Sequence, residues 1–439
     1  MAKLEIEALQ PGSNISSTTS EGVSQRIKVL VTGGLGFVGS AIVRALQEQH
    51  PEWVVCILDA AEDPRGLPEY QDDDYGLLRG CSYEHVQADI TNQMDVMEAL
   101  ERIKPDAVVH SAGMVPPLSE RYSRRIEALV RKTNVTGTQH VVGAAKQTGC
   151  RALVYTSSCC AVVDDMSMSY PNIDERWPVA DKSSIYGESK VEAERIVIAA
   201  NTNREQAQES AGDDPTEKSL HPRPQRPMLT CVLRPSVIFG EGDNQLIPSI
   251  HACIAKGESR FIIGDGCNLW DTTYVGNVAD AHVLALENLL SIRAKRNPVD
   301  ADEKDVVESA RLGAGSAAGE TFFIQNNEPI SFREFSLAVW KEFGHYPPWL
   351  EIRIPEGLGW ALGLVAELFT RISGRPLTLS RGSVMDAAAM RYATGNKASR
   401  ILGYRPRIGL EVGIKTSCQD YARRLQRRQE RADVCREQT

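Results

Sequence analysis

The segment Thr32-Gly33-Gly34-Leu35-Gly36-Phe37-Val38-Gly39 constrains this chain most, because it directly follows the apolar run Ile27–Val31. The order predicts a buried strand, a turn almost free of side chains, and then a helix. Such a turn lets backbone N–H groups approach a pyrophosphate, and the start of the helix favours an anion. A second apolar run, Val54–Leu58, ends at Asp59, twenty residues after Gly39, where a ribose-binding carboxylate belongs. The pattern therefore predicts a dinucleotide site.

Strand and helix patterns alternate through the first 160 residues. Further strands are expected at Glu84–Gln87, Ala107–His110 and Ala152–Thr156, and helices at Phe37–Gln49, Gln93–Arg102 and Glu120–Gln147. Apolar strands separated by amphipathic helices predict an α/β fold, a Rossmann-type doubly wound parallel sheet with a smaller C-terminal substrate lobe. Ligands of such sheets bind at the carboxyl ends of the strands.

Composition narrows the class of protein. The 439 residues carry a net charge of −9, which argues against a nucleic-acid partner. The ten cysteines show no metal-ligand spacing, so we expect no metal site and reduced thiols in an intracellular protein. No run of 18 apolar residues is present, which argues against a membrane-crossing helix.

The chain divides into four parts. Residues 1–25 are polar and are expected to form a disordered tail. Residues 26–228 form the expected NAD(P)-binding Rossmann domain, with a flexible insertion at 200–227. Residues 229–423 supply the remaining Rossmann strands and the substrate lobe, with a flexible insertion at 293–319. Residues 424–439 are expected to form a charged, solvated helical end or tail.

Tyr186 and Lys190 form the candidate catalytic pair. They lie four residues apart at the start of an expected helix, with Ser183 or Ser184 as its N-cap, so both side chains leave one helical face. A nearby ammonium stabilises a phenolate, so we expect Lys190 to lower the pKa of Tyr186 and make it a general base for an alcohol. Ser158, at the end of the fifth strand, is expected to hold the substrate oxygen.

On these residues the chain resembles the extended short-chain dehydrogenases/reductases, and within them the 3β-hydroxysteroid dehydrogenase family. It is most similar to the branch of sterol-4α-carboxylate 3-dehydrogenases, which act with decarboxylation. The resemblance runs from about residue 27 to 423, outside the two insertions. Besides the glycine turn and the Tyr186/Lys190 pair, it is carried by segments 233–240, 243–248, 262–271, 274–282, 319–329 and 402–406.

The resemblance implies roles for particular residues. Tyr186 would be the general base, Lys190 its partner and a ribose ligand, and Ser158 the catalytic serine, with Ser157 the fallback. The implied cofactor-binding residues are Gly33, Gly36, Phe37, Val38, Gly39, Asp59, Asp89, Ile90, Ala112, Asn134, Tyr186, Lys190, Pro235, Val237 and Ile238. The thiols of Cys159-Cys160 depart from the smaller residues often found after the serine, and they bear on which substrate fits.

The charge at residue 59 bears on the cofactor. A carboxylate accepts hydrogen bonds from the ribose hydroxyls and repels a 2′-phosphate, which favours NAD. Arg65, six residues further on, is the feature that leaves NADP open.

The expected reaction is NAD(P)-dependent oxidation of a 3β-hydroxyl on a sterol or triterpenoid, with loss of CO2 where a 4α-carboxylate is present. Three alternatives stay open: a 3β-hydroxysteroid or meroterpenoid dehydrogenase without decarboxylation, a nucleotide-sugar epimerase, and a non-catalytic dinucleotide sensor. An epimerase needs a lobe that binds a diphosphate, against which the apolar stretch at 357–372 argues. A sensor on this fold usually lacks the tyrosine or the lysine, and both are present.

The apolar stretch Gly357–Phe369 has two interpretations. Its apolar residues recur at helical spacing, which is typical of a lobe helix packed on the core. The stretch is too short to span a bilayer, but with Glu367 and Arg371 at its flank it also suits peripheral association with a membrane surface. A homodimer, and a place in the cytosol or on the cytoplasmic face of the endoplasmic reticulum, are further expectations.

Overall fold

The computed structural model describes residues 26–66, 76–117, 119–163, 168–180, 183–202, 227–291, 315–374 and 379–437. The expected tail at 1–25 and most of the two expected insertions lie outside the described residues. Residues 315–319, expected within the second insertion, are instead packed against the core. Ala317 is buried, and its N–H donates to the Asn288 side chain at 2.8 Å.

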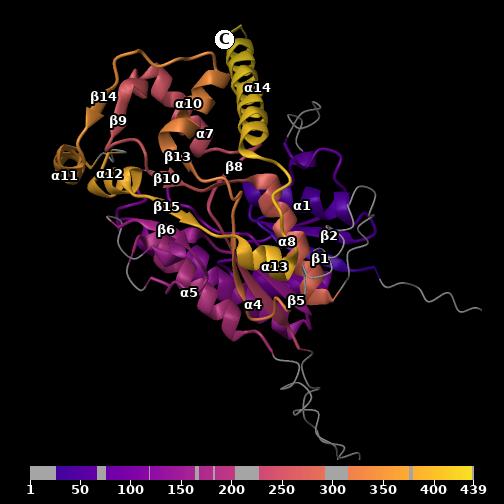
Figure 1. The fold of residues 1–439 in the computed structure, drawn as a ribbon. Helices are drawn as coiled ribbons and strands as arrows, with labels where there is room; N and C mark the ends of the chain where they lie inside the picture. Colours follow the sequence, from indigo (N-terminus) through magenta and orange to yellow (C-terminus); the bar gives the residue numbers. More distant parts are fainter. Residues whose placement is uncertain are drawn as a thin grey trace, which may run out of the picture.

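A seven-stranded parallel sheet forms the centre of the molecule (Figure 1). Its strands are β1 (Lys28–Thr32), β2 (Val54–Asp59), β3 (Glu84–Gln87), β4 (Ala107–His110), β5 (Ala152–Thr156), β7 (Leu229–Pro235) and β12 (Thr321–Ile324). Their order is β12-β7-β5-β4-β1-β2-β3, so the chain reverses direction across the sheet between β1 and β4. The predicted doubly wound fold is confirmed, and its switch point lies beside the glycine turn.

Helices cover both faces of the sheet, because its strands are apolar on both sides. Val29 and Val31 of β1 pack in the same core as α1 (Phe37–Gln49) and α8 (Val275–Leu290). Leu30 points to the opposite core, formed with α2 (Gln93–Ile103), α4 (Gly137–Gln147) and α5 (Ile185–Ala199). This alternation places α1 and α8 on one face of the sheet and α2, α4 and α5 on the other.

The prediction of one regular helix over Glu120–Gln147 is wrong in two respects: the helix begins later, and it is not regular throughout. Residues 120–126 form turns, and the helix begins with α3 (Glu127–Arg131). A π-helical turn, Lys132–Thr136, then joins α3 to α4. In the turn before α3, the Ser123 hydroxyl donates to the Glu120 carboxylate at 2.6 Å, an alternative to helix that short polar side chains favour.

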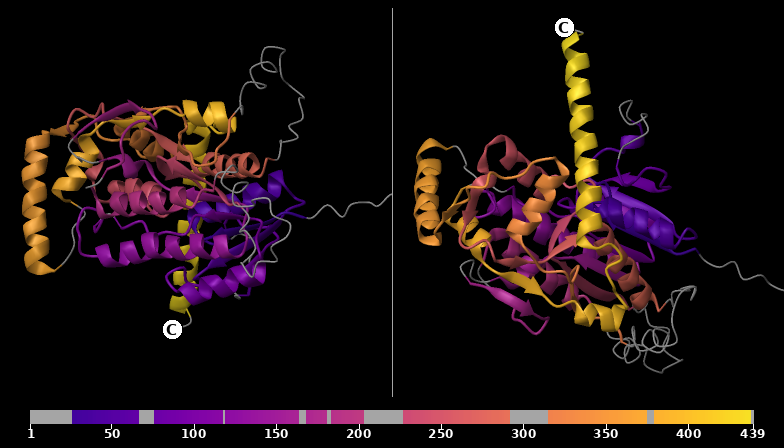
Figure 2. Two further views of the ribbon diagram at one scale, coloured as in Figure 1. Left: turned by 90° about the horizontal axis from the view of Figure 1, so that it is seen from below. Right: turned by 45° about the horizontal axis from the view of Figure 1, so that its top comes forward.

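The remaining elements form the lobe above the sheet and the end of the chain. The strands are β6 (Tyr170–Ile173), β8 (Val237–Phe239), β9 (Phe261–Ile263), β10 (Leu269–Trp270), β11 (Thr272–Tyr274), β13 (Ile330–Ser331), β14 (Ile352–Ile354) and β15 (Arg391–Ala393). The helices are α7 (Leu246–Ala255), α10 (Phe332–Glu342), α11 (Glu356–Ser373), α12 (Arg381–Ala388), α13 (Asn396–Leu402) and α14 (Leu410–Glu437). The helix α14 continues to Glu437, through the segment expected to form a charged end, and projects from the body (Figures 1 and 2).

Candidate active site

The glycine turn is built by close backbone approach. The Gly33 N–H donates to the Leu58 carbonyl at 2.8 Å, and Gly33 has a φ of +68°. A Cβ at Gly39 would lie 2.0 Å from the Gly33 carbonyl oxygen, and a Cβ at Gly33 would lie 2.7 Å from the Cα of Ala112. Only glycine fits these two positions, and Ala112 therefore borders the turn as expected. The result is a backbone cradle at the start of α1, of the kind that holds a pyrophosphate.

Asp59 lies at the end of β2, beside this cradle. Its carboxylate accepts hydrogen bonds from the N–H groups of Leu35 and Ala61, both at 3.0 Å. Arg65 is the residue that left NADP as a possible cofactor, but its side chain contacts other residues of the described chain. Its guanidinium pairs with Asp63 at 2.6 Å and stacks over the Tyr83 ring at 3.7 Å. The guanidinium of Arg65 is thus paired with Asp63 rather than with Asp59.

Asp89 and Ile90 follow β3 at the same edge of the sheet. The Asp89 carboxylate caps its own turn, accepting from the Thr91 N–H at 2.8 Å and the Thr91 hydroxyl at 2.9 Å. Ile90 is buried against Gly137, where a Cβ would lie 2.7 Å from its side chain. Both residues lie where an adenine edge is expected, and Asp89 stays exposed to solvent.

Asn134 sits within the π-helical turn and is buried. Its side-chain amide accepts from the Met114 N–H at 2.7 Å and donates to the Ser189 hydroxyl at 2.9 Å. A Cβ on Gly113 would lie 3.3 Å from both the Asn134 Oδ1 and the Lys190 Nζ. The structure thus brings Asn134 and Lys190 together around the end of β4. Single π-helical turns recur at functional sites, so the irregularity of the helix supports a functional role for Asn134.

Tyr186, Lys190 and Ser158 meet at the carboxyl end of β5. Ser184 is the N-cap of α5, with its hydroxyl accepting from the Gly187 N–H at 3.1 Å. The Lys190 Nζ lies 5.7 Å from the centre of the Tyr186 ring and donates to the Thr156 carbonyl at 2.9 Å. The start of α5 packs tightly on the turn after Ser158, since a Cβ at Gly187 would lie 2.6 Å from the Cys160 carbonyl oxygen.

The expected lowering of the Tyr186 pKa by Lys190 is wrong, because the surroundings of Tyr186 raise its pKa instead. Burial raises the pKa of Tyr186, and the charge of Cys160 adds to that rise, while a hydrogen bond with Ser158 and the charge of Arg121 oppose it. Burial also lowers the pKa of Lys190 to about 8. The sequence argument counted the ammonium and left out the cost of removing the phenol from water, which is larger here.

Cys159 and Cys160 begin the turn that follows Ser158. The Cys160 N–H donates to the Ser158 hydroxyl at 3.2 Å. A hydrogen bond from Cys159, with the nearby charges of Arg121 and Arg391, lowers the pKa of Cys160 below its usual value. Both thiols are free in the structure, as the sequence predicts.

Elements of the lobe close over this region. The Tyr122 hydroxyl donates to the Asp386 carboxylate at 2.5 Å, and Asp386 also pairs with Arg391 of β15. Arg121 donates to the Gln245 side chain, just before α7, at 2.8 Å. No spacing or motif in the sequence singled out these side chains, because they come from three distant segments.

Ser157, the fallback serine, points away from Tyr186. Its hydroxyl donates to the Glu194 carboxylate at 2.5 Å, and Glu194 forms a bidentate pair with Arg234 at 2.8 and 2.6 Å. This geometry favours Ser158 as the serine that faces the phenol. The sequence analysis missed Glu194, although its place four residues after Lys190 was a signal for it.

Pro235, Val237 and Ile238 continue from the end of β7 into β8. Pro235 is paired with Ile324 of β12, and β8 pairs with β11. Phe37 and Val38 are partly buried at the start of α1, and Phe37 lies against Gly242. The expected nicotinamide-side residues therefore lie at the same end of the sheet as Ser158 and the glycine turn.

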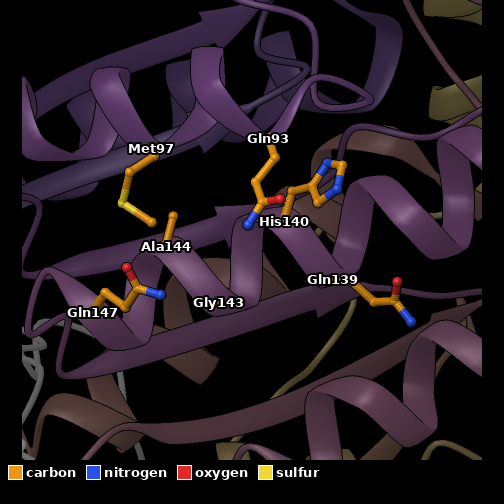
Figure 3. Close-up of a pocket in the computed structure, with 7 residues that line it drawn as sticks. All are labelled: Gln93, Met97, Gln139, His140, Gly143, Ala144 and Gln147. Atoms are coloured by element: carbon orange, nitrogen blue, oxygen red, sulfur yellow. The ribbon is translucent and has the colours of Figure 1, made fainter.

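A surface hollow elsewhere contains none of these residues. It lies between α2 and α4 and is lined by Gln93, Met97, Gln139, His140, Gly143, Ala144 and Gln147 (Figure 3). The His140 Nδ1–H donates to the Ile90 carbonyl at 2.9 Å. The hollow lies in the outer layer of helices, whereas the candidate catalytic residues lie at the carboxyl ends of the strands.

A backbone cradle at the switch point, with a Ser–Tyr–Lys group beside it, defines a dinucleotide-dependent oxidoreductase of the short-chain dehydrogenase type. A model of the NAD dependent epimerase/dehydratase family matches residues 29–297. The chain belongs to this family, and several of its curated relatives carry the names of sterol enzymes.

Two of these relatives match nearly the whole chain. The sterol-4-alpha-carboxylate 3-dehydrogenase, decarboxylating, of Candida albicans is 31% identical over 88% of this chain and 95% of its own length. The 3beta-hydroxysteroid-dehydrogenase/decarboxylase isoform 1 of Arabidopsis thaliana is 30% identical over 92% of this chain and 82% of its own. The predicted resemblance to the sterol branch is thereby confirmed.

Solved structures share the fold at lower identity. The UDP-glucuronic acid 4-epimerase from Bacillus cereus in complex with NAD superposes with a TM-score of 0.60 at 18% identity, covering 91% of this chain and 99% of that chain. This likeness shows the architecture only.

Proposed function

We propose that this protein oxidises the 3β-hydroxyl of a 4α-carboxysterol with NAD and that the product loses its C-4 carboxyl group as CO2. The observation that carries the proposal is the group of Ser158, Tyr186 and Lys190 beside the glycine turn. The names of the sterol relatives, which match nearly the full chain, support this substrate class.

The site residues divide the oxidation between them. Ser158 orients the substrate hydroxyl toward Tyr186, whose oxygen accepts the hydroxyl proton once the phenol has lost its own. Lys190, held by the Thr156 carbonyl, supplies positive charge on the same face of α5 and a donor for ribose hydroxyls. NAD, when bound, would supply the hydride acceptor for C-3. The glycine cradle fits its pyrophosphate and Asp59 its adenosine ribose, and Asp59 with a neutralised Arg65 favours NAD over NADP.

Decarboxylation follows from the chemistry of the product. Oxidation places a carbonyl at C-3, next to the carbon that bears the carboxylate. The bond between C-4 and the carboxylate breaks, CO2 leaves, and the electron pair passes into the C-3 carbonyl as an enolate. A proton then returns to C-4, so this step needs no further oxidant.

The test is a substrate panel with purified protein. NAD or NADP is combined with 3β-hydroxysterols that carry or lack a 4α-carboxyl group, and with UDP-sugars. We expect growth of the absorbance of reduced nicotinamide with NAD and the carboxysterol, with a product lighter by CO2. Oxidation without CO2 loss would favour the 3β-hydroxysteroid or meroterpenoid alternative, and turnover of UDP-sugars only would overturn the sterol proposal.

We further propose that α11 rests on a membrane surface. Its small residues Gly359 and Gly363 face α12, where a Cβ on Gly363 would lie 2.6 Å from the Arg381 nitrogen. The large apolar side chains therefore point outward. Those of α11 that are exposed are Leu358, Trp360, Leu362, Val365, Leu368, Phe369 and Ile372.

The surroundings of α11 support this proposal. The helix stands at the edge of the molecule in every view (Figures 1 and 2). Trp349, shortly before it, is 93% exposed, whereas large apolar side chains of this size normally help to fill a core. Across the described ranges, no helix is long and apolar enough to cross a bilayer. An apolar face of this kind suits burial at the headgroup level, where a sterol substrate enters from the bilayer.

A further inference from the structure

Glu194 and Arg234 form a buried ion pair directly beneath the catalytic group. Their side chains are only 5% and 4% exposed, and two hydrogen bonds of 2.8 and 2.6 Å join them. The Arg234 guanidinium also lies 5.6 Å from the centre of the Phe323 ring. Buried ion pairs seldom add net stability over apolar residues of the same size, so this pair calls for another explanation.

The pair connects the three elements that build the site. Glu194 stands on α5, one helical turn after Lys190, and accepts from the Ser157 hydroxyl at 2.5 Å. Arg234 is in β7, immediately before Pro235, and the neighbouring Leu233 carbonyl accepts from the Ser157 N–H at 2.7 Å. The residue after Ser157 is the serine that faces Tyr186.

We propose that Glu194, held by Arg234, is a positioning residue that fixes the Ser157–Ser158 segment and places a carboxylate one helical turn from Lys190 of the catalytic group. The inference rests on the proposed function only in assigning Lys190 a role in the reaction. Glu194 itself touches neither substrate nor cofactor in this assignment.

The charges around Lys190 make Glu194 the carboxylate that sustains its ammonium. From α5, Glu194 favours the charged form, and from the turn after β5, Cys160 does the same. From β4, His110 is buried and neutral, with its pKa lowered to about 3 by burial and by the charge of Lys190. The rings of Tyr155 in β5 and Tyr186 in α5 lie 4.9 and 5.7 Å from the ammonium. Burial opposes all of these and lowers the Lys190 pKa.

The test removes the carboxylate without leaving a buried charge unpaired. Glu194→Gln alone strands Arg234, so the main variant is the double change Glu194→Gln with Arg234→Met. Neutral replacement of a whole buried pair is usually tolerated. The matched control is Glu192→Gln, on the same helix, whose carboxylate pairs with Arg131 at 2.5 Å and is 41% exposed.

Two readouts are followed as a function of pH. The first is the alkaline limb of kcat/KM for the sterol, which reports loss of the Lys190 proton. The second needs no activity: it is the difference in unfolding free energy between each protein and its Lys190→Met derivative. In the wild-type background this difference closes as pH rises from about 8 toward 10.5, the range between the folded and ordinary pKa of Lys190.

We expect both curves of the double variant to move about one pH unit lower, because loss of a nearby carboxylate makes Lys190 easier to deprotonate. Glu192→Gln should leave both curves in place. The same loss of activity at every pH, with an unmoved stability curve, would show a merely structural role and overturn the proposal. Absence of sterol oxidation by the wild-type protein would overturn the proposed function instead, while the stability curve still decides on Glu194.

Discussion

At the residue scale, Tyr186 is the side chain on which the proposed chemistry depends. Burial raises its pKa, while the hydrogen bond with Ser158 and the charge of Arg121 lower it. Its hydroxyl, rather than its ring, is therefore the group that the site is built around.

Tyr186→Phe removes only that hydroxyl. We expect kcat/KM for sterol oxidation to fall by about 10²- to 10⁴-fold, the usual contribution of a positioned general base. NAD affinity, measured by titration calorimetry, should change little, because the glycine cradle is intact. A variant with wild-type turnover would remove Tyr186 from the mechanism.

Lys190 illustrates a conflict between stability and function. Its folded pKa, about 8, is below the usual 10.5, so burying the charged form costs about 3 kcal/mol at pH values below 8. As pH rises from 8 to 10.5 the folded protein loses this proton first, and the cost is relieved.

Lys190→Met should therefore be inactive yet more stable than the wild type at pH 7. The gain is expected to be less than the full 3 kcal/mol, since the hydrogen bond to Thr156 is lost. Chemical denaturation across pH 7 to 10.5 measures it. A gain that grows with pH, or a variant that is less stable at pH 7, would contradict this account of the buried charge.

At the scale of elements, apolar runs located the strands of the central sheet well, because a strand buried on both faces must be apolar throughout. β3, β4 and β5 were predicted with the bounds that they have. Glycines located the cradle for an equally local reason: a Cβ has no room at Gly33 or Gly39.

Features that depend on distant partners were beyond the sequence. Glu194 and Arg234 are 40 residues apart, and only the packing of α5 on β7 shows that they pair. The helical periodicity predicted for α11 is correct. Its apolar face does not pack on the core as in the first interpretation, since glycines face the protein and leucines face outward. The spacing of apolar residues shows which face of a helix is apolar, but it does not show what covers that face.

The outward face of α11 yields a prediction with a close control. Val365 is 63% exposed on α11, and Val412 is 56% exposed on α14. Val365→Glu should lower the fraction of protein that floats with phosphatidylcholine vesicles several-fold, because a carboxylate at the headgroup level keeps its water. Val412→Glu should float as the wild type does. If both variants floated equally, the proposal that α11 binds the membrane would be wrong.

At the scale of the whole molecule, the site lies where two parts of the fold close on each other. The cofactor side, with the glycine turn and Asp59, belongs to the sheet. The substrate side is closed by the lobe through Tyr122, Asp386 and Arg391, with Gly382 of α12 packed on the Tyr122 ring. The two binding events should therefore respond differently to changes at this junction.

Asp386→Asn tests that separation. It removes the carboxylate that neutralises Arg391, whose charge acts on Cys159 and Cys160 beside Ser158, and it weakens the contact with Tyr122. We expect KM for the sterol to rise about tenfold, as for loss of one charge-assisted hydrogen bond that orders the pocket, and KM for NAD to change little. Asp174→Asn, which breaks the exposed pair with Arg176, is the control. The junction acts on the Cys159-Cys160 turn and not on the glycine cradle. Equal rises in KM for the sterol and in KM for NAD would therefore mean that the lobe and the sheet act as one rigid binding unit.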